Sequence, residues 1–420
     1  GVFSFNRIRV VCSPLSKTFV HLLMRSEWVF FPRRFPKRVG ATAFSSWGLG
    51  HPFVIRLAYI ISLFSMSSAL LHPVGFYSMF CCLVFMSSLR VFDDHGVVLQ
   101  GEERLVIDPH RKRLVADHVI VSHAHSDHVS IGAANLFPYS MSAPTQALIA
   151  SKIPEKAVTR AVDFKTHFDS PNGKISLVNS GHILGSGQVV CEGESKVCVT
   201  TDFKLQDSIV QKGAEIVPCD VLVIESTFGL KQFSFPGREA VYAEMGQWIK
   251  ETIASNRLPV LAGYATGKAQ ELTKIVNEYS SVTPFVHEGI FEKNSVYEKW
   301  GSSLGEFVKI EHNLKEAELL ILPPTLCSPH VLHAISVSAG KPVSSAKCTG
   351  WSWKEAHART FALSDHADYS QLLQYVREAS PKQVFTHHGF DRELAQAITR
   401  ELGIPARPLA DAKQLALAAC

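Results

Sequence analysis

The chain has 420 residues, of which 46% are apolar, so it is long enough for two domains that each have a hydrophobic core. Its nine cysteines are scattered, without a Cys-x-x-Cys pair, which favours a reduced, cytoplasmic compartment over a disulfide framework. The net charge of +4 is unevenly distributed, because residues 1–85 carry +8 and residues 86–420 carry −4. Broad attraction of the main body to polyanions is thereby excluded, and any anion binding has to be local.

Residues 1–85 differ in composition from the rest, with 12 of the 26 Phe residues and no Asp. Residues 54–71 form an apolar run long enough for a membrane span, although it contains Arg56 and is followed by Pro73. A leader poor in acidic residues and rich in Arg and Ser is also typical of an organellar transit peptide. We favour a third interpretation, upstream sequence translated in frame with a natural start near Met86. Membrane anchoring is expected only if residues 54–85 belong to the natural protein.

The next part of the chain, up to Phe228, alternates short β-rich runs with turns. The runs lie at residues 97–100, 105–109, 118–128, 174–180, 187–193, 196–202 and 221–227. They predict a sheet-rich half in which the third strand ends in a histidine cluster, where loops can carry ligands.

After Phe228 the pattern changes to strands that alternate with helices. Val241, Met245 and Ile249 have helical spacing and predict a helix over residues 238–255. The other predicted elements are a strand at 258–264, a helix at 268–279 and strands at 284–289 and 318–324. This alternation predicts a doubly wound α/β insert over residues 229–347, after which the polar segment 343–353 leads back to the first domain.

The C-terminal part alternates once more and is expected to complete the domain begun by residues 86–228. It contains a β-rich run at 358–368, a helix around 372–377, a strand at 383–389 and a helix at 391–402 that Gly403 caps. The last predicted segment of the first domain is therefore 348–420.

Four potential metal ligands lie within six residues of the run VSHAHSDHV, namely His123, His125, Asp127 and His128. Imidazoles and a carboxylate suit Zn²⁺, and ligands two residues apart on an extended chain point the same way. His123 and His125 can therefore bind one ion, and a turn at Ser126 lets Asp127 and His128 face a second. The alternative is a chance cluster of surface histidines.

Two further potential ligands follow downstream. His182 stands among glycines in SGHILGSG, and Asp202 ends an apolar strand in TTDFK. Taken alone, His182 would be an ordinary polar residue and Asp202 a turn former. Because they follow the histidine cluster, we predict that both are ligands and that the carboxylate of Asp202 bridges two ions.

Residues 97–228 resemble the metallo-β-lactamase superfamily, whose α/β fold is an αβ/βα four-layer sandwich. The insert and the tail resemble the compact α/β domain of its β-CASP nuclease subgroup, because ESTFG, LSDHADY and THHG match that subgroup's marks at Glu225, His366 and His388. Within this subgroup the resemblance is closest to ligase-associated DNA exonuclease-like proteins and to archaeal relatives of the RNA 3′-end processing endonuclease. The segments that carry this closer resemblance include FGLKQFSFP and GYATGKAQEL.

The resemblance implies a role for each residue. One Zn²⁺ would be held by His123, His125 and His182, and the other by Asp127, His128 and His388, with Asp202 bridging and Mn²⁺ as an alternative metal. His387 is an alternative to His388. The resemblance makes His366 the general acid, oriented by Glu225, and leaves a ligand role for His366 as the alternative. Asp127 is expected to be essential for cleavage.

The implied activity is hydrolysis of phosphodiester bonds in RNA or DNA, by exonuclease or endonuclease action in processing or repair. Water activated by two metal ions would attack phosphorus, and His366 would protonate the leaving oxygen. The implied partners are nucleic acid, preferably single-stranded, a DNA ligase or processing complex, and a second copy of the chain. The alternatives are an acyl or thioester hydrolase of the same superfamily and a non-catalytic subunit of a processing complex.

GYATGKAQEL places Gly267 and Lys268 where a strand runs into a helix start. Free backbone N–H groups and one cation favour a phosphate there, although the segment is no Walker motif. Together with the resemblance, this predicts a clamp for the nucleic-acid backbone. The alternative is an ordinary helix start, since Gly and Lys open many helices.

Overall fold

The computed structural model describes residues 2–5, 8–11, 89–132, 137–311, 314–351 and 359–412. The chain divides into two compact units, residues 1–86 and 87–420. In the first, β1 (Val2–Phe5) and β2 (Ile8–Val11) pair as an antiparallel hairpin. The apolar run 54–71 and the predicted start at Met86 lie outside the described residues. Of the helices that are described, none has the length and apolar character needed to cross a membrane.

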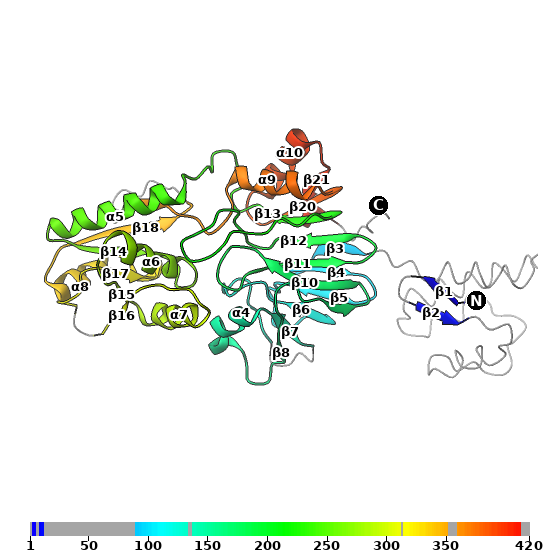
Figure 1. Ribbon diagram of the computed structural model, residues 1–420, viewed down its shortest axis with the longest axis horizontal. Coiled ribbons are helices and arrows are strands. Elements are labelled where there is room, and N and C mark those ends of the chain that lie inside the picture. Colours follow the sequence, from blue (N-terminus) through cyan, green and yellow to red (C-terminus); the bar gives the residue numbers. More distant parts are fainter. Residues whose placement is uncertain are drawn as a thin grey trace, which may run out of the picture. The chain divides into compact units, whose positions relative to one another are not determined.

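Two β-sheets pack against each other in the larger unit (Figure 1). The first sheet has the strands β3 (Arg90–Asp93), β4 (Val97–Gln100), β5 (Arg104–Ile107), β6 (His118–Ile120), β7 (Tyr139–Met141) and β8 (Thr159–Ala161), in this order. The second has the order β21 (Ala406–Pro408), β20 (Gln383–His387), β13 (Val221–Glu225), β12 (Lys196–Val199), β11 (Gly187–Glu192), β10 (Gly173–Asn179) and β9 (Phe168–Ser170). The predicted strands of this half are confirmed, although residues 118–128 form a strand only at their start.

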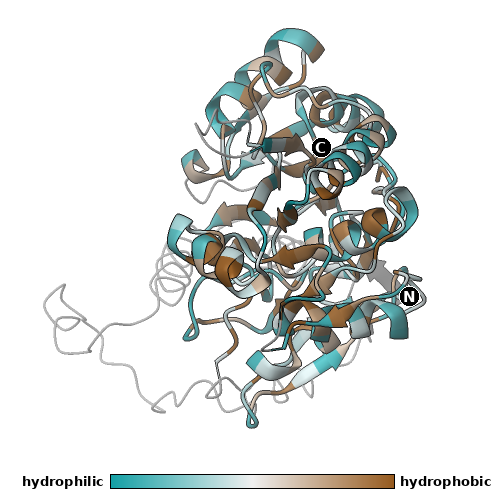
Figure 2. Cartoon of the chain, turned by 90° about the vertical axis from the view of Figure 1, so that its left-hand side faces the viewer, coloured by the Kyte–Doolittle hydropathy of each residue, from teal (hydrophilic) through white to brown (hydrophobic). Residues whose placement is uncertain are grey.

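Alternating side chains place the core between these two sheets. Leu105 and Ile107 of β5 pack with Val189 and Val223 of the second sheet, whereas Val106 between them belongs to the cluster on the outer face. This is the two-residue period of a strand that is buried on both faces. Figure 2 shows the same arrangement, with brown apolar strands inside and teal hydrophilic surfaces on the helices.

Helices cover the outer faces of both sheets. α9 (Tyr369–Ala379) and α10 (Asp391–Leu402) pack on the second sheet through residues such as Leu372 and Ile398. α4 (Ala143–Leu148) packs on the first sheet through Leu148. The predicted four-layer αβ/βα sandwich is thereby confirmed, as are the predicted helices near residues 372–377 and at 391–402.

The insert is built on an open parallel sheet. Its strands lie in the order β16 (Val308–Lys309), β15 (Phe285–Val286), β17 (Leu320–Leu322), β14 (Leu258–Ala262), β18 (Val343–Thr349) and β19 (Arg359–Ala362). Its helices are α5 (Arg238–Ala254), α6 (Lys268–Tyr279), α7 (Glu288–Lys299) and α8 (Pro329–Ala339). α5 and α6 pack on one face of the sheet with Leu261, and α8 packs on the other with Val260. The doubly wound α/β prediction is correct.

Two details of the insert differ from the prediction. Its sheet continues to Ala362 instead of ending at Lys347, since β18 pairs with β14 and β19 pairs with β18. The polar segment 343–353, predicted to lead back to the first domain, contains β18, in which Ala346 and Cys348 are buried while the residue between them is half-buried. The segment at 284–289 is a strand for only two residues, after which α7 begins at Glu288.

Candidate metal centre

Several of the predicted site residues lie at the ends of parallel strands. Asp202 follows β12, Glu225 ends β13 and His388 follows β20, three strands that lie side by side and parallel. In the first sheet, Asp108 follows β5 and His123 follows the parallel neighbour β6. The carboxyl ends of parallel strands share one edge of a sheet, so residues far apart in the sequence meet there.

Four predicted ligands form one cluster in which the ligand atoms lie within 4.8 Å of one another: His123, His125, His182 and Asp202. His125 Nε2 lies 3.1 Å from the carbonyl oxygen of Thr266, and His182 Nδ1 lies 2.8 Å from that of Asp365. Because a carbonyl oxygen only accepts, each of these nitrogens carries the proton of its neutral ring. His125 Nδ1 and His182 Nε2 therefore face each other at 2.9 Å without protons, an arrangement that favours a shared cation.

His123 carries a buried ring nitrogen that suits a metal. Its Nδ1 lies 2.8 Å from the hydroxyl of Ser122, which donates to Asp108 at 2.5 Å, so the hydroxyl oxygen accepts the Nδ1 proton. Its Nε2 is buried and has no hydrogen-bond partner among the described residues. Three imidazoles and one carboxylate are a donor set of the kind that Zn²⁺ prefers. The residues of this cluster therefore fit a zinc ion.

The carboxylate of Asp202 lies among the rings of both predicted ligand sets. Its Oδ2 lies 3.5 Å from His123 Nε2, 3.3 Å from His128 Nε2 and 3.7 Å from His182 Nε2. Burial disfavours its charged form, but His128 and His366 outweigh burial and hold the pKa of Asp202 well below its usual range. Burial and neighbouring histidines also lower the pKa of His123 and His182 well below the usual value. Asp202 is thus held as a carboxylate beside the neutral imidazoles of His123 and His182, the forms that bind a cation.

The second predicted set is less closely assembled. His128 Nδ1 lies 2.8 Å from the carboxylate of Asp108, and His128 Nε2 lies 3.7 Å from Asp127. Burial opposes protonation of His128, but Asp202 and Asp108 outweigh it and raise its pKa well above the usual value. The side chain of Asp127 is 76% exposed and joins none of the potential ligand clusters found in the described part of the chain. Asp108 orients the ring of His128 as a partner of a metal ligand would, and the ligand roles of His128 and Asp127 both stay predictions.

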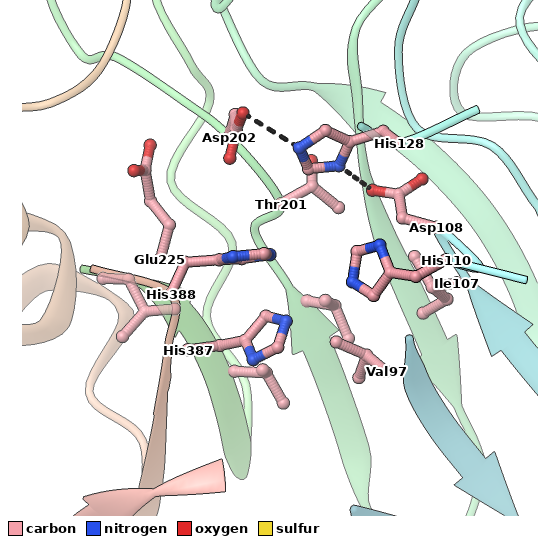
Figure 3. A pocket seen from close by; sticks show the side chains of 13 residues that line it. Val97, Ile107, Asp108, His110, His128, Thr201, Asp202, Glu225, His387 and His388 are labelled. Carbon is pink, nitrogen blue, oxygen red and sulfur yellow. Dashed lines mark hydrogen bonds and ion pairs between the residues drawn. The ribbon is translucent and has the colours of Figure 1, made fainter. Parts of the chain in front are cut away.

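A small pocket beside His128 contains the two candidates for the last ligand. His387 and His388 extend from one wall of it toward His110 and His128 on the other (Figure 3). His110, His387 and His388 form a cluster of potential ligand atoms, and the rings of His388 and His128 have centroids 5.8 Å apart. Burial lowers the pKa of His387 to about 3. Since both adjacent histidines line this pocket, His388 stays a prediction and His387 its alternative.

The predicted acid–base pair is formed by His366 and Glu225. His366 Nδ1 lies 3.1 and 3.2 Å from the two carboxylate oxygens of Glu225, which also accepts from the Phe203 amide at 2.9 Å. Burial opposes the charged form of His366, but Glu225 and Asp202 outweigh it and raise its pKa to about 9. His366 lines a pocket of about 250 Å³ together with His125, His182 and Asp202, here called the metal-side pocket. A protonated histidine therefore faces the same space as the ligand cluster.

Lys268, the predicted phosphate clamp, lines the metal-side pocket and also pairs with two carboxylates. It is 2% exposed, and its Nζ lies 2.9 Å from Asp365 and 3.6 Å from Glu271. The amide of Gly267 donates to the side chain of Gln270 at 2.7 Å. The Lys268 ammonium group and the Gly267 amide thus both have partners within the protein. The ion pair joins the insert to the segment carrying His366, and the phosphate clamp at Gly267 and Lys268 stays a prediction.

Replacing Lys268 by Met should lower the free energy of unfolding by about 3–5 kcal/mol, because it leaves the buried Asp365 and Glu271 without this counter-charge. Urea denaturation measures the change. Lys309→Ala is the matched control, since it removes an exposed pair with Glu288 and should cost less than about 1 kcal/mol. Equal stabilities of the two variants would contradict the stabilising role of the buried pair.

Four residues that position the ligands were not predicted, namely Asp108, Ser122, Thr266 and Asp365. Asp108 and Ser122 orient His123 and His128, and the carbonyl oxygens of Thr266 and Asp365 orient His125 and His182. Asp108 had a signal in the sequence, since it ends the apolar run LVI as Asp202 ends another. The contacts made by the carbonyl oxygens of Thr266 and Asp365 have no signal in the sequence, because any residue type presents a backbone carbonyl.

The comparisons with known proteins agree with this fold and with a metal-dependent hydrolase. Residues 354–407 match the family model described as "Zn-dependent metallo-hydrolase RNA specificity domain". A "Probable DNA ligase" of Opitutus terrae is 32% identical over 311 residues, which are 71% of this chain and 29% of that protein. "RNase aCSPSF2" of Saccharolobus solfataricus is 24% identical (68% of this chain, 72% of that protein), and "Probable RNase MJ4" of Methanocaldococcus jannaschii 26% identical (74% and 90%).

A four-layer sandwich with candidate histidine and carboxylate ligands at its strand ends is typical of metal-dependent hydrolases. The matched family model and the relatives named as ribonucleases narrow this class to hydrolases that resemble nucleases. Together these findings support the β-CASP group of the metallo-β-lactamase superfamily as the family of this chain, which spans less than a third of the ligase-named relative.

Proposed function

We propose that the chain is a zinc-dependent nuclease that hydrolyses phosphodiester bonds in RNA or DNA. The observation that carries this proposal is the metal-side pocket, where the ligands His125, His182 and Asp202 face the same space as His366. The match to an RNA specificity domain and the ribonuclease names of relatives support a nucleic-acid substrate. The similarity to a protein named as a DNA ligase supports DNA as the alternative substrate and a DNA ligase as a candidate partner.

In this proposal each residue of the centre keeps its predicted role. His123, His125 and His182 would hold one zinc ion, and Asp127, His128 and His388 the other, with Asp202 between them. Bound zinc would supply water of near-neutral pKa and neutralise the charge that develops on the phosphoryl oxygens.

The acid–base pair completes the reaction. As the bond between phosphorus and the 3′ oxygen breaks, His366 transfers a proton to that oxygen, and Glu225 keeps the ring oriented through Nδ1. The oxygen of the attacking water stays on phosphorus, so the products are a 3′ hydroxyl and a 5′ phosphate.

A gel assay tests the proposal. The full chain, supplied with Zn²⁺ or Mn²⁺, is offered single-stranded RNA and DNA labelled at either end, beside a generic thioester. Cleavage that leaves 5′ phosphates is the expected result, and the label pattern distinguishes exonuclease from endonuclease action. Hydrolysis of the thioester alone would replace the proposal by an acyl hydrolase. No hydrolysis of either substrate, together with zinc content near zero, would favour a non-catalytic subunit.

A further inference from the structure

A second pocket of about 250 Å³ adjoins the metal-side pocket and lies in the insert. Here called the insert pocket, it is lined by Ala262, Tyr264, Pro324, Thr349, Trp351 and Thr360, among others. Tyr264, Thr349 and Trp351 also line the metal-side pocket. The two pockets therefore meet at these side chains, and a chain-like ligand bound at the candidate metal centre can continue past them.

The insert pocket lies where an open parallel sheet usually binds its ligands. β14 leads through α6 to β15 on one side, whereas its neighbour β17 leads through α8 to β18 on the other side of β14 (Figure 1). Ala262 ends β14, Pro324 follows β17 and Thr349 ends β18, so the pocket sits at the carboxyl ends of these strands. Crevices at such topological switch points are the preferred ligand sites of doubly wound sheets.

Two aromatic side chains stand where the pockets meet. Tyr264 follows β14 and is 59% exposed, although it is a large and partly apolar side chain. Trp351 is half-buried, and its ring is held against Phe228 and Phe233 at centroid distances of 4.8 and 5.5 Å. A fixed indole beside an exposed phenol provides aromatic faces on which a planar group can stack.

We propose that Tyr264 and Trp351 hold the nucleobase of a nucleotide next to the scissile phosphate and direct a single strand from the metal-side pocket into the insert pocket. This inference rests on the proposed nuclease function. Bases stack on aromatic side chains without regard to their identity, so the contact selects an unpaired strand rather than a sequence. A base within a duplex is already stacked and paired, and it has to be freed before it enters.

Variants of Tyr264 test the inference with a single-stranded oligonucleotide. Tyr264→Ala should lower kcat/KM about 5- to 150-fold, mainly through KM, which is the range expected for loss of one base–aromatic stack. Tyr264→Phe keeps the ring and should stay close to the wild type. Trp300→Ala is the matched control, because Trp300 is another exposed aromatic residue, 43% exposed, at the end of α7 and among the lining residues of neither pocket.

An abasic nucleotide placed at one position after another along the strand provides the complementary measurement. One position next to the cleavage site should reproduce the loss caused by Tyr264→Ala, and the two changes together should cost no more than either alone, since both remove the same contact. The inference would be overturned if the losses caused by Tyr264→Ala and by the abasic nucleotide multiplied when combined. It would also be overturned if Tyr264→Ala and Trp300→Ala had the same KM. Either result would leave the nuclease proposal intact. Absence of any cleavage by the wild type would instead refute the nuclease proposal itself.

Discussion

Replacing His182 by Ala should lower phosphodiester cleavage by at least about 1,000-fold, since a two-metal centre supplies several kcal/mol of transition-state stabilisation and each 1.4 kcal/mol is tenfold in rate. His182 Nε2 faces His125 Nδ1 at 2.9 Å, while its Nδ1 is held by the Asp365 carbonyl oxygen. Its removal therefore leaves the first ion without one of its three predicted imidazoles. Elemental analysis should show zinc falling from two ions per chain toward one or none.

His330→Ala is the control for this variant, because His330 is an exposed histidine on α8, a helix of the insert. It should keep both its zinc and its activity. Circular dichroism of the two variants should be the same, since ligand loss is expected to leave the packed sandwich intact. A folded His182→Ala protein with full activity would contradict the assignment of this metal centre as the site of cleavage.

Replacing His366 by Ala should slow cleavage of an oligonucleotide about 100- to 10,000-fold, the usual contribution of a general acid. KM should change little if His366 acts on the leaving oxygen and not on binding. The wild-type rate should fall as the pH rises through the pKa of His366, because the donor is then lost, and this limb of the pH profile should be missing from the variant. Steady-state rates over a pH series measure both effects.

A substrate with sulfur in place of the 3′ bridging oxygen separates proton donation from a structural effect. A thiolate leaves without a proton, so His366→Ala should cleave this substrate nearly as fast as the wild type does. Glu225→Gln keeps the size of the side chain but removes the charge beside His366 Nδ1, and should give an intermediate loss that the sulfur substrate also relieves. Equal defects on oxygen and sulfur substrates would show that His366 acts as a ligand, the alternative that its cluster with Asp202 and Glu225 allows.

Much of the fold could be predicted from the sequence because its signals are local. α6 and α10 occupy the predicted ranges, residues 268–279 and 391–402, since helical spacing and a C-terminal Gly403 at φ 69° are properties of one short segment. The strands of the sandwich follow from short β-rich runs bounded by turns. The polar β18 lacks that signal, because only alternate positions near its end are fully buried, although the sheet of the insert continues through it to β19.

The sequence by itself determined which residues are candidates for the chemistry, since the spacing in VSHAHSDHV predicts metal ligands and the later motifs add His182, Asp202, Glu225 and His366. Only the tertiary structure decided how these groups are used. The carbonyl oxygen of Asp365 fixes the proton of the His182 ring, and the carboxylate of the same residue pairs with Lys268, which the sequence had placed at a phosphate. Such contacts join residues far apart along the chain, and burial gives them their strength, so no local pattern encodes them.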